Sequence, residues 1–555
     1  MSTRPDIRYR ALYGDRLVPC YDDCPENLDR MLVRVAARQG ARPAVLDGGQ
    51  ETSYAALVTW AGAIAAGLAG RGIARGDRVA LFAGNGAGFI AALLGIWRLG
   101  AIAVPIGNRQ TADELTYMLG QCGAAALIFD RGLAERLPAP GAMPSVRLLA
   151  VIDDGTGVAA ALPAGTVGLD ELAAGQAPLS DPPAVSAQDV ACIMYTSGTT
   201  GRPKGAMLSH LGFYHTARNY EFQFGYTAED RMLLVIPATH ISGLLATVLV
   251  TLQTGGCIVC RRSFSARDVL ATIAQERISA AVMVPAMYNL LLLEPDIAAH
   301  DLSAWRIGHF GGAAMAEVTI RKLAEAMPGL RLYNGFGSTE TLSAVTLTGQ
   351  LGPDDPLESV GKLLPCIDIR VLNPDGQEVK AGEAGELWIR GPGNAIGYWN
   401  NPDATRAAFV GGYWRSGDIG SVDEAGYLRV FDRIKDMVNR GGYKVFCVEL
   451  ENVIHEFPGV IEVAAVASPC PVLGERVHVF VHARHAPDAS ALRDFCRERL
   501  ADYKVPDFVT FCAEPLPRNL NGKLSKEPLK AAAREAAAQG GAHRRPEDRR
   551  PGKGD

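Results

Sequence analysis

A single segment of this 555-residue chain carries the strongest structural signal: Tyr195-Thr196-Ser197-Gly198-Thr199-Thr200-Gly201-Arg202-Pro203-Lys204-Gly205. It places four Ser/Thr hydroxyls, three glycines and one lysine within eleven residues, directly after the apolar run Val190-Ala191-Cys192-Ile193-Met194. The apolar run predicts a buried strand. Glycines let a backbone approach a ligand closely, and successive N–H groups, hydroxyls and an ammonium can then bind an anion. The segment therefore predicts a phosphate-binding loop rather than an ordinary polar turn.

Two common nucleotide motifs do not fit this segment. A P-loop has the form G-x-x-x-x-G-K-[ST], but Lys204 does not directly follow Gly201, and Gly205 stands where a hydroxyl is needed. The dinucleotide fingerprint G-x-G-x-x-G also fails, because the glycines in 84–88 and 391–397 have the wrong spacing. The phosphate loop is thus of a different kind.

Composition narrows the class of protein. With 555 residues, 48% of them hydrophobic, the chain is long enough for at least two domains, and its net charge of -5 argues against a nucleic-acid partner. Eleven cysteines form no disulfide framework; their close pairs are Cys20/Cys24 and Cys257/Cys260, so free thiols in a reducing cytosol are expected. No apolar signal peptide opens the chain, and the apolar stretch 89–106 is too interrupted for a membrane span. We expect a cytoplasmic protein without a membrane span.

Apolar periodicity predicts an α/β chain with four parts. An irregular N-terminal segment, 1–28, precedes a large domain, 29–432, in which helices, among them Leu57–Leu68 and Ala91–Leu99, alternate with strands. A β-rich part follows residue 352, where the Asp375-Gly376 turn predicts a hairpin between strands at 367–372 and 386–390. A small α+β domain is expected over 433–530 and a disordered tail over 531–555. The fold class is therefore α/β, with layered α/β subdomains, a β-rich subdomain and a small mobile α+β C-terminal domain.

The phosphate loop and several later motifs resemble the adenylate-forming, or AMP-binding, superfamily, which includes the acyl-CoA synthetases. The resemblance extends from about Thr52 to Lys526. The motifs that carry it occur in the family's order: Thr52–Leu57, Gly76–Leu81, Pro237–His240, Gly311–Ala314, Asn334–Glu340, Tyr413–Asp418, Asp432–Asp436, Gly441–Lys444 and Pro517–Lys523.

This resemblance implies a reaction in two steps. A carboxylate attacks the α-phosphorus of ATP to give an acyl-adenylate and pyrophosphate, and a thiol then displaces AMP to give a thioester. The first step depends mainly on neutralising phosphate charge. Lys523 would bridge the substrate carboxylate and the α-phosphate, and Thr339 would donate to the α-phosphate. Thr199 or Thr200, together with Glu340, would hold Mg²⁺, which prefers oxygen ligands.

The other matched positions would bind ATP and coenzyme A. Asp418 would accept both ribose hydroxyls with support from Arg433, and Phe336 would stack on adenine where the family usually has tyrosine. Lys435 matches the hinge about which the small domain would swing, and Gly442 would line a narrow tunnel for the pantetheine arm. The full predicted set for these ligands is Thr196, Ser197, Gly198, Thr199, Thr200, Gly201, Lys204, Gly312, Ala313, Asn334, Gly335, Phe336, Asp418, Arg433 and Gly442.

Substrate and thiol are less constrained by the sequence. His240 matches a histidine beside the acyl site, and no aspartate is present there for an amino-acid ammonium. An apolar pocket from Ile241, Gly243, Gly311, Gly335 and Leu342, with Ser338 close by, favours a fatty or aromatic acid. No carrier domain follows Lys523, so coenzyme A is the expected thiol and a separate acyl carrier protein the alternative.

Other readings remain open at this stage. A luciferase-like oxygenase is possible by descent, but no residue signals it. A catalytically dead nucleotide-binding module is disfavoured, because Glu340, Lys523 and the phosphate loop are all intact. The chain could also pair as a homodimer.

Overall fold

The computed structural model describes residues 6–153, 155, 161–196, 202–313, 315, 317–351, 358–484, 488–518 and 524–538. Its contacts divide the chain into two compact units. The first takes in 1–315, 319–370 and 388–415, and the second 316–318, 371–387 and 416–555. The domain boundary expected near residue 432 lies inside the second unit, so these units and the predicted domains are different divisions of the chain. Among the described helices, none combines the length and the apolar character needed to cross a bilayer.

One sheet of the first unit has seven strands in the order β11-β10-β6-β5-β7-β8-β9. Their bounds are β5 (Arg78–Phe82), β6 (Ile102–Pro105), β7 (Ala124–Asp130), β8 (Leu148–Ile152), β9 (Val167–Gly168), β10 (Val190–Thr196) and β11 (Lys204–Ser209). Neighbours are parallel except β11, which is antiparallel to β10. All seven residues of β7 are buried, as is usual for a parallel strand covered on both faces. The buried strand predicted before the phosphate loop is β10.

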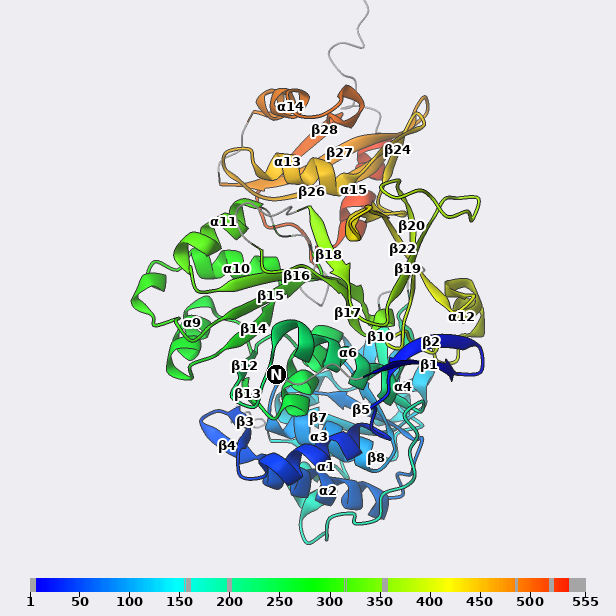
Figure 1. Ribbon diagram of the computed structural model, residues 1–555, viewed down its shortest axis with the longest axis vertical. Coiled ribbons are helices and arrows are strands. Elements are labelled where there is room, and N and C mark those ends of the chain that lie inside the picture. Colours follow the sequence, from blue (N-terminus) through cyan, green and yellow to red (C-terminus); the bar gives the residue numbers. More distant parts are fainter. Residues whose placement is uncertain are drawn as a thin grey trace, which may run out of the picture. The chain divides into compact units, whose positions relative to one another are not determined.

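A second sheet in this unit contains the run β18-β17-β16-β15-β14-β12-β13-β3-β4. The bounds are β3 (Pro43–Asp47), β4 (Gln50–Ser53), β12 (Arg231–Leu234), β13 (Cys257–Cys260), β14 (Ala280–Met283), β15 (Ile307–Gly311), β16 (Arg331–Ser338), β17 (Ser343–Leu347) and β18 (Ser359–Leu363). Pairing is parallel from β3 to β16, and β4, β17 and β18 add antiparallel edges. Figure 1 shows β12, β14, β15 and β16 side by side.

Helices cover both faces of both sheets. Their bounds are α1 (Leu28–Gln39), α2 (Tyr54–Gly70), α3 (Ala87–Arg98), α4 (Ala112–Cys122), α5 (Leu169–Ala173), α6 (His210–Phe224), α7 (Ile241–Gly243), α8 (Val250–Thr254), α9 (Ala266–Gln275), α10 (Pro285–Leu292), α11 (Glu317–Ala326) and α12 (Pro402–Ala408). A π-helical segment, Leu244–Leu249, joins α7 to α8. The helices predicted around Leu57–Leu68 and Ala91–Leu99 are α2 and α3.

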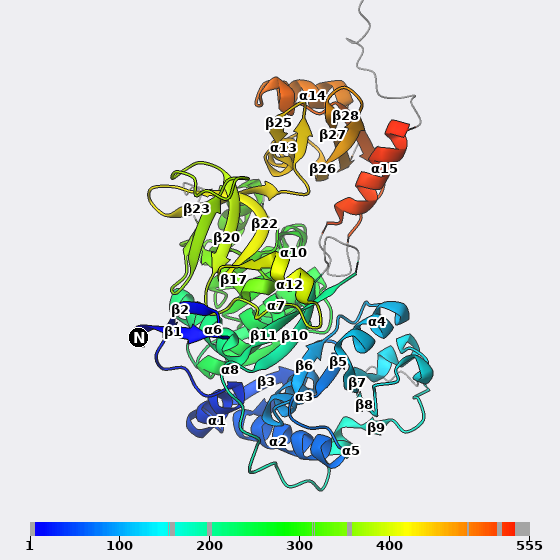
Figure 2. The ribbon, with the colours of Figure 1, turned by 90° about the vertical axis from the view of Figure 1, so that its right-hand side faces the viewer.

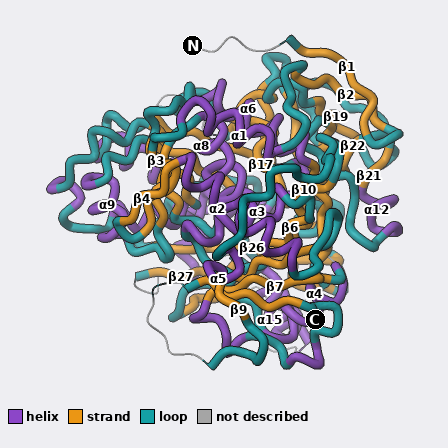
Figure 3. Tube along the Cα trace, turned by 90° about the horizontal axis from the view of Figure 1, so that it is seen from below, coloured by secondary structure: helices purple, strands orange, loops and turns teal. Residues whose placement is uncertain are grey.

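The buried side chains define five layers. The largest apolar cluster joins α1, α2, α3 and α6 to strands of both sheets, so these helices form the central layer (Figure 3). A second cluster packs α9, α10 and α11 on the outer face of the β12–β16 sheet (Figure 1). A third packs α4 on the outer face of the seven-stranded sheet (Figure 2). This is the layered α/β architecture that the alternating sequence pattern predicts.

The N-terminal segment is more regular than its sequence suggested. Strands β1 (Ile7–Leu12) and β2 (Arg16–Tyr21) form an antiparallel hairpin. Its turn places Tyr13 and Gly14 at φ +53° and +82°. Leu12 and Val18 pack against Leu211 of α6, and this burial stabilises the hairpin. The Pro- and Tyr-bearing sequence of the segment contains no pattern that predicts it.

The second unit contains a five-stranded sheet with helices on both faces. The order is β25-β24-β27-β26, and β28 pairs in parallel with β27. The bounds are β24 (Val438–Arg440), β25 (Tyr443–Val445), α13 (Cys447–His455), β26 (Val460–Cys470), β27 (Gly474–Ala483), α14 (Ala489–Arg497), β28 (Phe508–Cys512) and α15 (Lys526–Ala538). One apolar cluster joins the sheet to α13 and α14, and another joins it to α15. Of the remaining strands, β21 (Phe409–Val410) belongs to the first unit and β23 (Tyr427–Arg433) to the second, while β19 (Asp368–Leu372), β20 (Gly385–Arg390) and β22 (Tyr413–Val422) have residues in both.

Two local predictions need correction. The Asp375-Gly376 turn closes a short loop bridged between Leu372 and Glu378, and does not connect β19 directly to β20. The tail expected from residue 531 starts too early, because α15 continues to Ala538 with Ala533 fully buried against β26. The alanine-rich sequence of this stretch predicts a frayed helix end. The packing of Ala533 against the sheet keeps the helix ordered, and the sequence alone does not show this packing. The expected lack of a disulfide framework is confirmed, since none of the eleven cysteines forms a disulfide, and nine of them are buried.

Candidate active site

The turn that carries Glu340 joins β16 to β17 in the first unit. Thr339–Thr341 form one 3-10 turn, and Leu342 and Ser343 follow at φ +54° and +85°, a region that residues with side chains rarely adopt. Gly337 makes this turn possible, because a Cβ there would lie 1.8 Å from the carbonyl oxygen of Ser343. Backbone strain of this kind is typical of functional sites.

Three hydroxyl groups surround the carboxylate of Glu340, whose side chain is buried. Oε1 accepts from Thr196 Oγ1 at 3.3 Å and from the Tyr398 hydroxyl at 3.0 Å, and Oε2 accepts from Ser338 Oγ. The backbone oxygen of Glu340 accepts from Ala395 N at 2.7 Å. Thr196 and Glu340, both predicted site residues, are thus brought together, and the acid is fixed in one orientation.

The segment predicted to bind phosphate lies between two paired strands, β10 and β11. Thr196 ends β10 and Lys204 begins β11, and the two residues face each other across the pair. Ser197, Gly198, Thr199, Thr200 and Gly201 lie outside the described residues, so their predicted phosphate and Mg²⁺ contacts stay predictions. The Lys204 ammonium lies 5.2 Å from the centre of the Tyr398 ring. Such a cation–π distance links the loop lysine to the residue that also binds Glu340.

Tyr398 is the site residue that sequence reasoning missed. It lies 58 positions from Glu340, and the sequence Gly397-Tyr398-Trp399 gives no signal of that contact. The pKa of the Tyr398 phenol is raised well above its ordinary value, mainly by burial and secondly by the negative charge of Glu340. The phenol therefore stays protonated and acts as a donor. Ser338 was expected near the acyl pocket, and the structure also makes it a partner of Glu340.

Glycines bring the ends of two parallel strands close together. Gly311 of β15 pairs with Gly335 of β16, and a Cβ at Gly311 would lie 2.6 Å from the Gly335 oxygen. Gly312, at φ +76°, and the exposed Ala313 follow directly, and their predicted contacts with the nucleotide stay predictions. In β16, Asn334 N donates to Thr348 Oγ1 at 2.8 Å.

Phe336 and Thr339 occupy the same end of β16. Phe336 is half-buried and pairs with Thr346 of β17, so part of its ring surface is available for stacking. Thr339 is half-buried at the first position of the Glu340 turn, and its backbone oxygen accepts from Leu342 N at 3.0 Å. Their predicted contacts with adenine and with the α-phosphate stay predictions.

His240 begins the helix that follows β12. Its backbone N donates to Pro237 O at 3.1 Å and its oxygen accepts from Leu244 N at 2.9 Å. Buried Asn85 fixes this segment, because its side chain donates to Ile236 O and accepts from Ala238 N. Helix α7 continues into the π-helical segment Leu244–Leu249, and π-helical turns are frequent at functional sites.

The remaining predicted residues belong to the second unit. Asp418 of β22 is buried, faces Arg433 of β23 and accepts from its Nε at 3.0 Å. Lys435 is exposed two residues later, and its oxygen accepts from Lys530 Nζ at 3.2 Å. Gly442 forms the turn between β24 and β25 at φ +93°. Lys523 lies outside the described residues.

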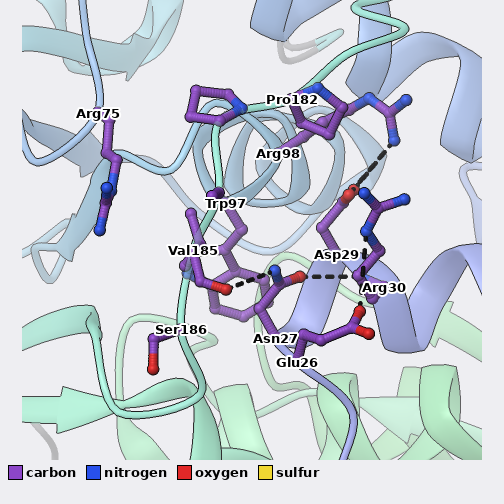
Figure 4. Close-up of a pocket in the computed structure, with 12 residues that line it drawn as sticks. Glu26, Asn27, Asp29, Arg30, Arg75, Trp97, Arg98, Pro182, Val185 and Ser186 are labelled. Carbon is purple, nitrogen blue, oxygen red and sulfur yellow. Dashed lines mark hydrogen bonds and ion pairs between the residues drawn. The ribbon is translucent and has the colours of Figure 1, made fainter.

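A separate pocket of about 490 Å³ lies beside α1 and α3 (Figure 4). Several of its polar side chains already have partners: Arg98 pairs with Asp29 at 3.1 Å, and Asn27 donates to the Val185 oxygen at 3.1 Å. None of the predicted site residues lines it. The residues around Glu340, and not this pocket, therefore remain the candidate active site.

Oxygen donors dominate the Glu340 site, which fits magnesium better than a soft metal. No cluster of three or more His, Cys, Asp or Glu side chains suited to a metal occurs among the described residues. Mg²⁺ is commonly held by one or two carboxylates together with substrate phosphates, so one oriented acid among hydroxyls is a suitable donor set.

Comparison with known proteins identifies the family of the chain. Residues 32–399 match the sequence profile of the family described as AMP-binding enzyme, and 449–523 match that of the AMP-binding enzyme C-terminal domain. A feruloyl-CoA synthase from Amycolatopsis sp is 34% identical over 89% of this chain and 96% of the relative. The long-chain-fatty-acid–CoA ligase FadD13 of Mycobacterium tuberculosis is 35% identical over 86% of this chain and 92% of the relative.

Solved structures show the same fold. The crystal structure of the anthranilate CoA ligase AuaEII, in complex with anthranoyl-AMP, matches with a TM-score of 0.85 at 26% identity, over 93% of this chain and 99% of that one. The relatives named here are CoA ligases or synthases. The chain therefore belongs to the AMP-binding enzyme family and is an AMP-forming acid–thiol ligase of the acyl-CoA synthetase type.

Proposed function

We propose that this ligase activates a fatty or aromatic acid and transfers it to coenzyme A. The observation that carries the substrate class is the lining predicted for the acyl group. Ile241 and Gly243 of α7, Gly335 of β16 and Leu342 are buried and uncharged, and the adjoining Gly311 has no side chain. An apolar acyl group suits such a lining, whereas an amino acid would bring an unpaired ammonium into it.

The first step forms a bond between a carboxylate oxygen of the acid and the α-phosphorus of ATP, and pyrophosphate leaves. Lys204 and the backbone of the phosphate loop would hold the β- and γ-phosphates, and Thr339 would donate to the α-phosphate. Lys523 would ease the repulsion between carboxylate and α-phosphate. Glu340, oriented by Thr196, Ser338 and Tyr398, would hold Mg²⁺, which would neutralise phosphate charge.

In the second step the sulfur of coenzyme A attacks the acyl carbon, AMP leaves with its phosphate oxygen, and the thiol proton is released. Asp418 would hold the ribose of the nucleotide, with Arg433 orienting its carboxylate. His240 would lie beside the acyl carbonyl. Lys435 would act as the hinge, and Gly442 would leave room for the pantetheine arm.

Pyrophosphate exchange tests the proposal. Exchange into ATP would be measured over straight-chain acids of increasing length and over benzoic, phenylacetic and cinnamic acids, followed by thioester formation with coenzyme A. We expect exchange with one of these two classes and thioester with coenzyme A. Exchange with amino acids alone would contradict the substrate class, and thioester formed solely on a carrier protein would contradict the thiol.

A half-reaction test addresses Lys523. Replacing Lys523→Ala should abolish exchange but leave thioester formation from supplied acyl-adenylate close to that of the unmodified enzyme. Lys380→Ala, an exposed lysine in a loop, is the matched control and should affect neither step. Equal loss of both steps in Lys523→Ala would contradict the role given to that lysine.

A further inference from the structure

One buried histidine in the first unit has no hydrogen-bond partner at either ring nitrogen. His309, on β15, is 4% exposed, and within the described residues neither Nδ1 nor Nε2 is paired. The other histidines of the central layer differ. His210 Nδ1 accepts from Leu28 N at 3.4 Å, and His215 Nε2 accepts from Tyr21 N at 2.7 Å. Buried polar groups are nearly always paired, so His309 needs an explanation.

The surroundings of His309 offer it no polar partner on the side of α6. Its ring lies 5.5 Å from that of Tyr220 and 5.6 Å from that of Phe224, centre to centre. The Tyr220 hydroxyl is already engaged, since it pairs with Ser343 Oγ at 2.9 Å. An unpaired buried donor or acceptor costs about 1–3 kcal/mol, and a neutral imidazole has one of each.

Gly335 lies directly against the histidine ring. A Cβ at Gly335 would lie 2.5 Å from His309 Nε2, so the ring occupies its position because residue 335 has no side chain. Gly335 is also one of the residues predicted to line the acyl pocket, and it pairs with Gly311, another of them. His309 therefore directs a polar nitrogen to a part of the fold whose other lining is apolar.

We propose that His309 is a specificity-determining residue that hydrogen-bonds an oxygen on the acyl moiety, away from the carboxylate. The substrate class is then an acid bearing a hydroxyl, ether or oxo group rather than a plain hydrocarbon acid. This rests on the proposed function, because it assigns the acyl group to the pocket at Gly335. Burial lowers the pKa of His309 to about 4, so the neutral ring keeps both a donor and an acceptor at neutral pH.

The competing explanation is a bound water that satisfies the ring in the free and in the loaded enzyme. In that case His309 would serve packing alone. The two explanations differ in one measurable ratio, the kcat/KM of an oxygen-bearing acid divided by that of its deoxygenated partner. A site built to hydrogen-bond a substrate group discriminates strongly against an analogue that lacks it.

The experiment compares matched acids on the full-length enzyme. The pairs are 4-hydroxycinnamic with cinnamic acid, 4-methoxycinnamic with 4-methylcinnamic acid, and a terminally hydroxylated fatty acid with its parent. We expect a preference of about tenfold or more for the oxygen-bearing member of at least one pair, the size of one net hydrogen bond. His309→Leu should reduce that ratio to about one, and His309→Asn, which keeps a donor and an acceptor, should retain part of it.

Two further variants distinguish loss of the proposed hydrogen bond from a general disruption of the site. Gly335→Ala should also lower the ratio, because its Cβ would displace the ring. Phe224→Leu, which alters the same surroundings without touching a polar atom, should change both acids of a pair alike. A ratio that is unchanged in His309→Leu, or a wild-type preference for the hydrocarbon member of every pair, overturns the inference. Exchange with none of the acids would overturn the proposed function as well.

Discussion

Tyr398 donates its hydroxyl to Oε1 of Glu340 over 3.0 Å, and its ring lies 5.2 Å from the ammonium of Lys204. One aromatic side chain thus contacts both the acid assigned to Mg²⁺ and the lysine assigned to the phosphates. We infer that Tyr398 is a positioning residue, since it acts on the predicted ligands through Glu340 and Lys204.

Replacing Tyr398→Phe should therefore weaken magnesium use while leaving the fold intact. It removes one hydrogen bond to a charged group, worth about 1.5–3 kcal/mol, so we expect adenylation to fall roughly 10- to 100-fold at low Mg²⁺. The measurement is the pyrophosphate-exchange rate against Mg²⁺ concentration. Partial recovery at high Mg²⁺ is expected, whereas a purely structural role would give a loss that Mg²⁺ does not relieve.

Tyr13→Phe is the matched control for this variant. This replacement also removes a hydroxyl contact, the partly buried one to Ser209 Oγ at 2.6 Å, but Tyr13 belongs to the N-terminal hairpin. Its replacement should lower stability without changing the Mg²⁺ dependence. An equal change in Mg²⁺ dependence in both variants would contradict the role of Tyr398.

Gly337→Ala tests whether the turn geometry sets the position of Glu340. The new Cβ would meet a backbone oxygen at 1.8 Å, which flexible side chains cannot relieve. We expect a loss of roughly 3 kcal/mol or more in unfolding free energy, or loss of nucleotide binding in whatever protein folds. Gly329→Ala, with no atom within 4 Å of its Cβ, should be nearly neutral, and a Gly337→Ala variant that matched it would show that the turn can shift.

Local sequence predicted the elements of this fold better than the contacts of its site. Strands β10 and β11 and helices α2 and α3 lie where apolar spacing and turn-forming residues close together in the chain place them. Tyr398 and Glu340 meet only because β11, the turn after β16 and the 395–398 segment converge, and no periodic pattern records such a meeting. The role proposed for His309 could not be predicted from the sequence for the same reason, because a single histidine in an apolar strand is usually a packed core residue. The hairpin β1–β2 and the end of α15 were missed because burial against distant residues decides them.

Asp418→Asn should separate nucleotide binding from stability in the second unit. The Arg433 side chain is 50% exposed, so its ion pair with Asp418 contributes about 0–1 kcal/mol to stability. A carboxylate that accepts two ribose hydroxyls is worth more, and we expect AMP affinity to fall about 10- to 100-fold by calorimetry. Asp375→Asn, an exposed acid in a turn of the same unit, should leave affinity unchanged. A large loss of stability in Asp418→Asn without loss of affinity would point to a structural role instead.

Buried histidines should make this protein sensitive to mild acid. Burial lowers the pKa to about 4 for His210 and His309 and to about 3 for His215, against 6.5 for an ordinary histidine. The unfolded chain then binds more protons than the folded one below pH 6.5, so the free energy of unfolding falls as pH drops from 6.5 toward 4. For His309 alone the loss is up to about 3 kcal/mol.

Urea denaturation at pH 7.5 and at pH 5 measures this effect. In His309→Leu one of the three groups is removed and no buried partner is orphaned, so the difference in unfolding free energy between the two pH values should shrink. Phe224→Leu alters the packing of the same ring but keeps all three histidines, and it should retain the wild-type difference. An unchanged pH difference in His309→Leu would mean that the ring is protonated in the folded state. That protonation would require an acidic group beside it, where the structure shows aromatic rings.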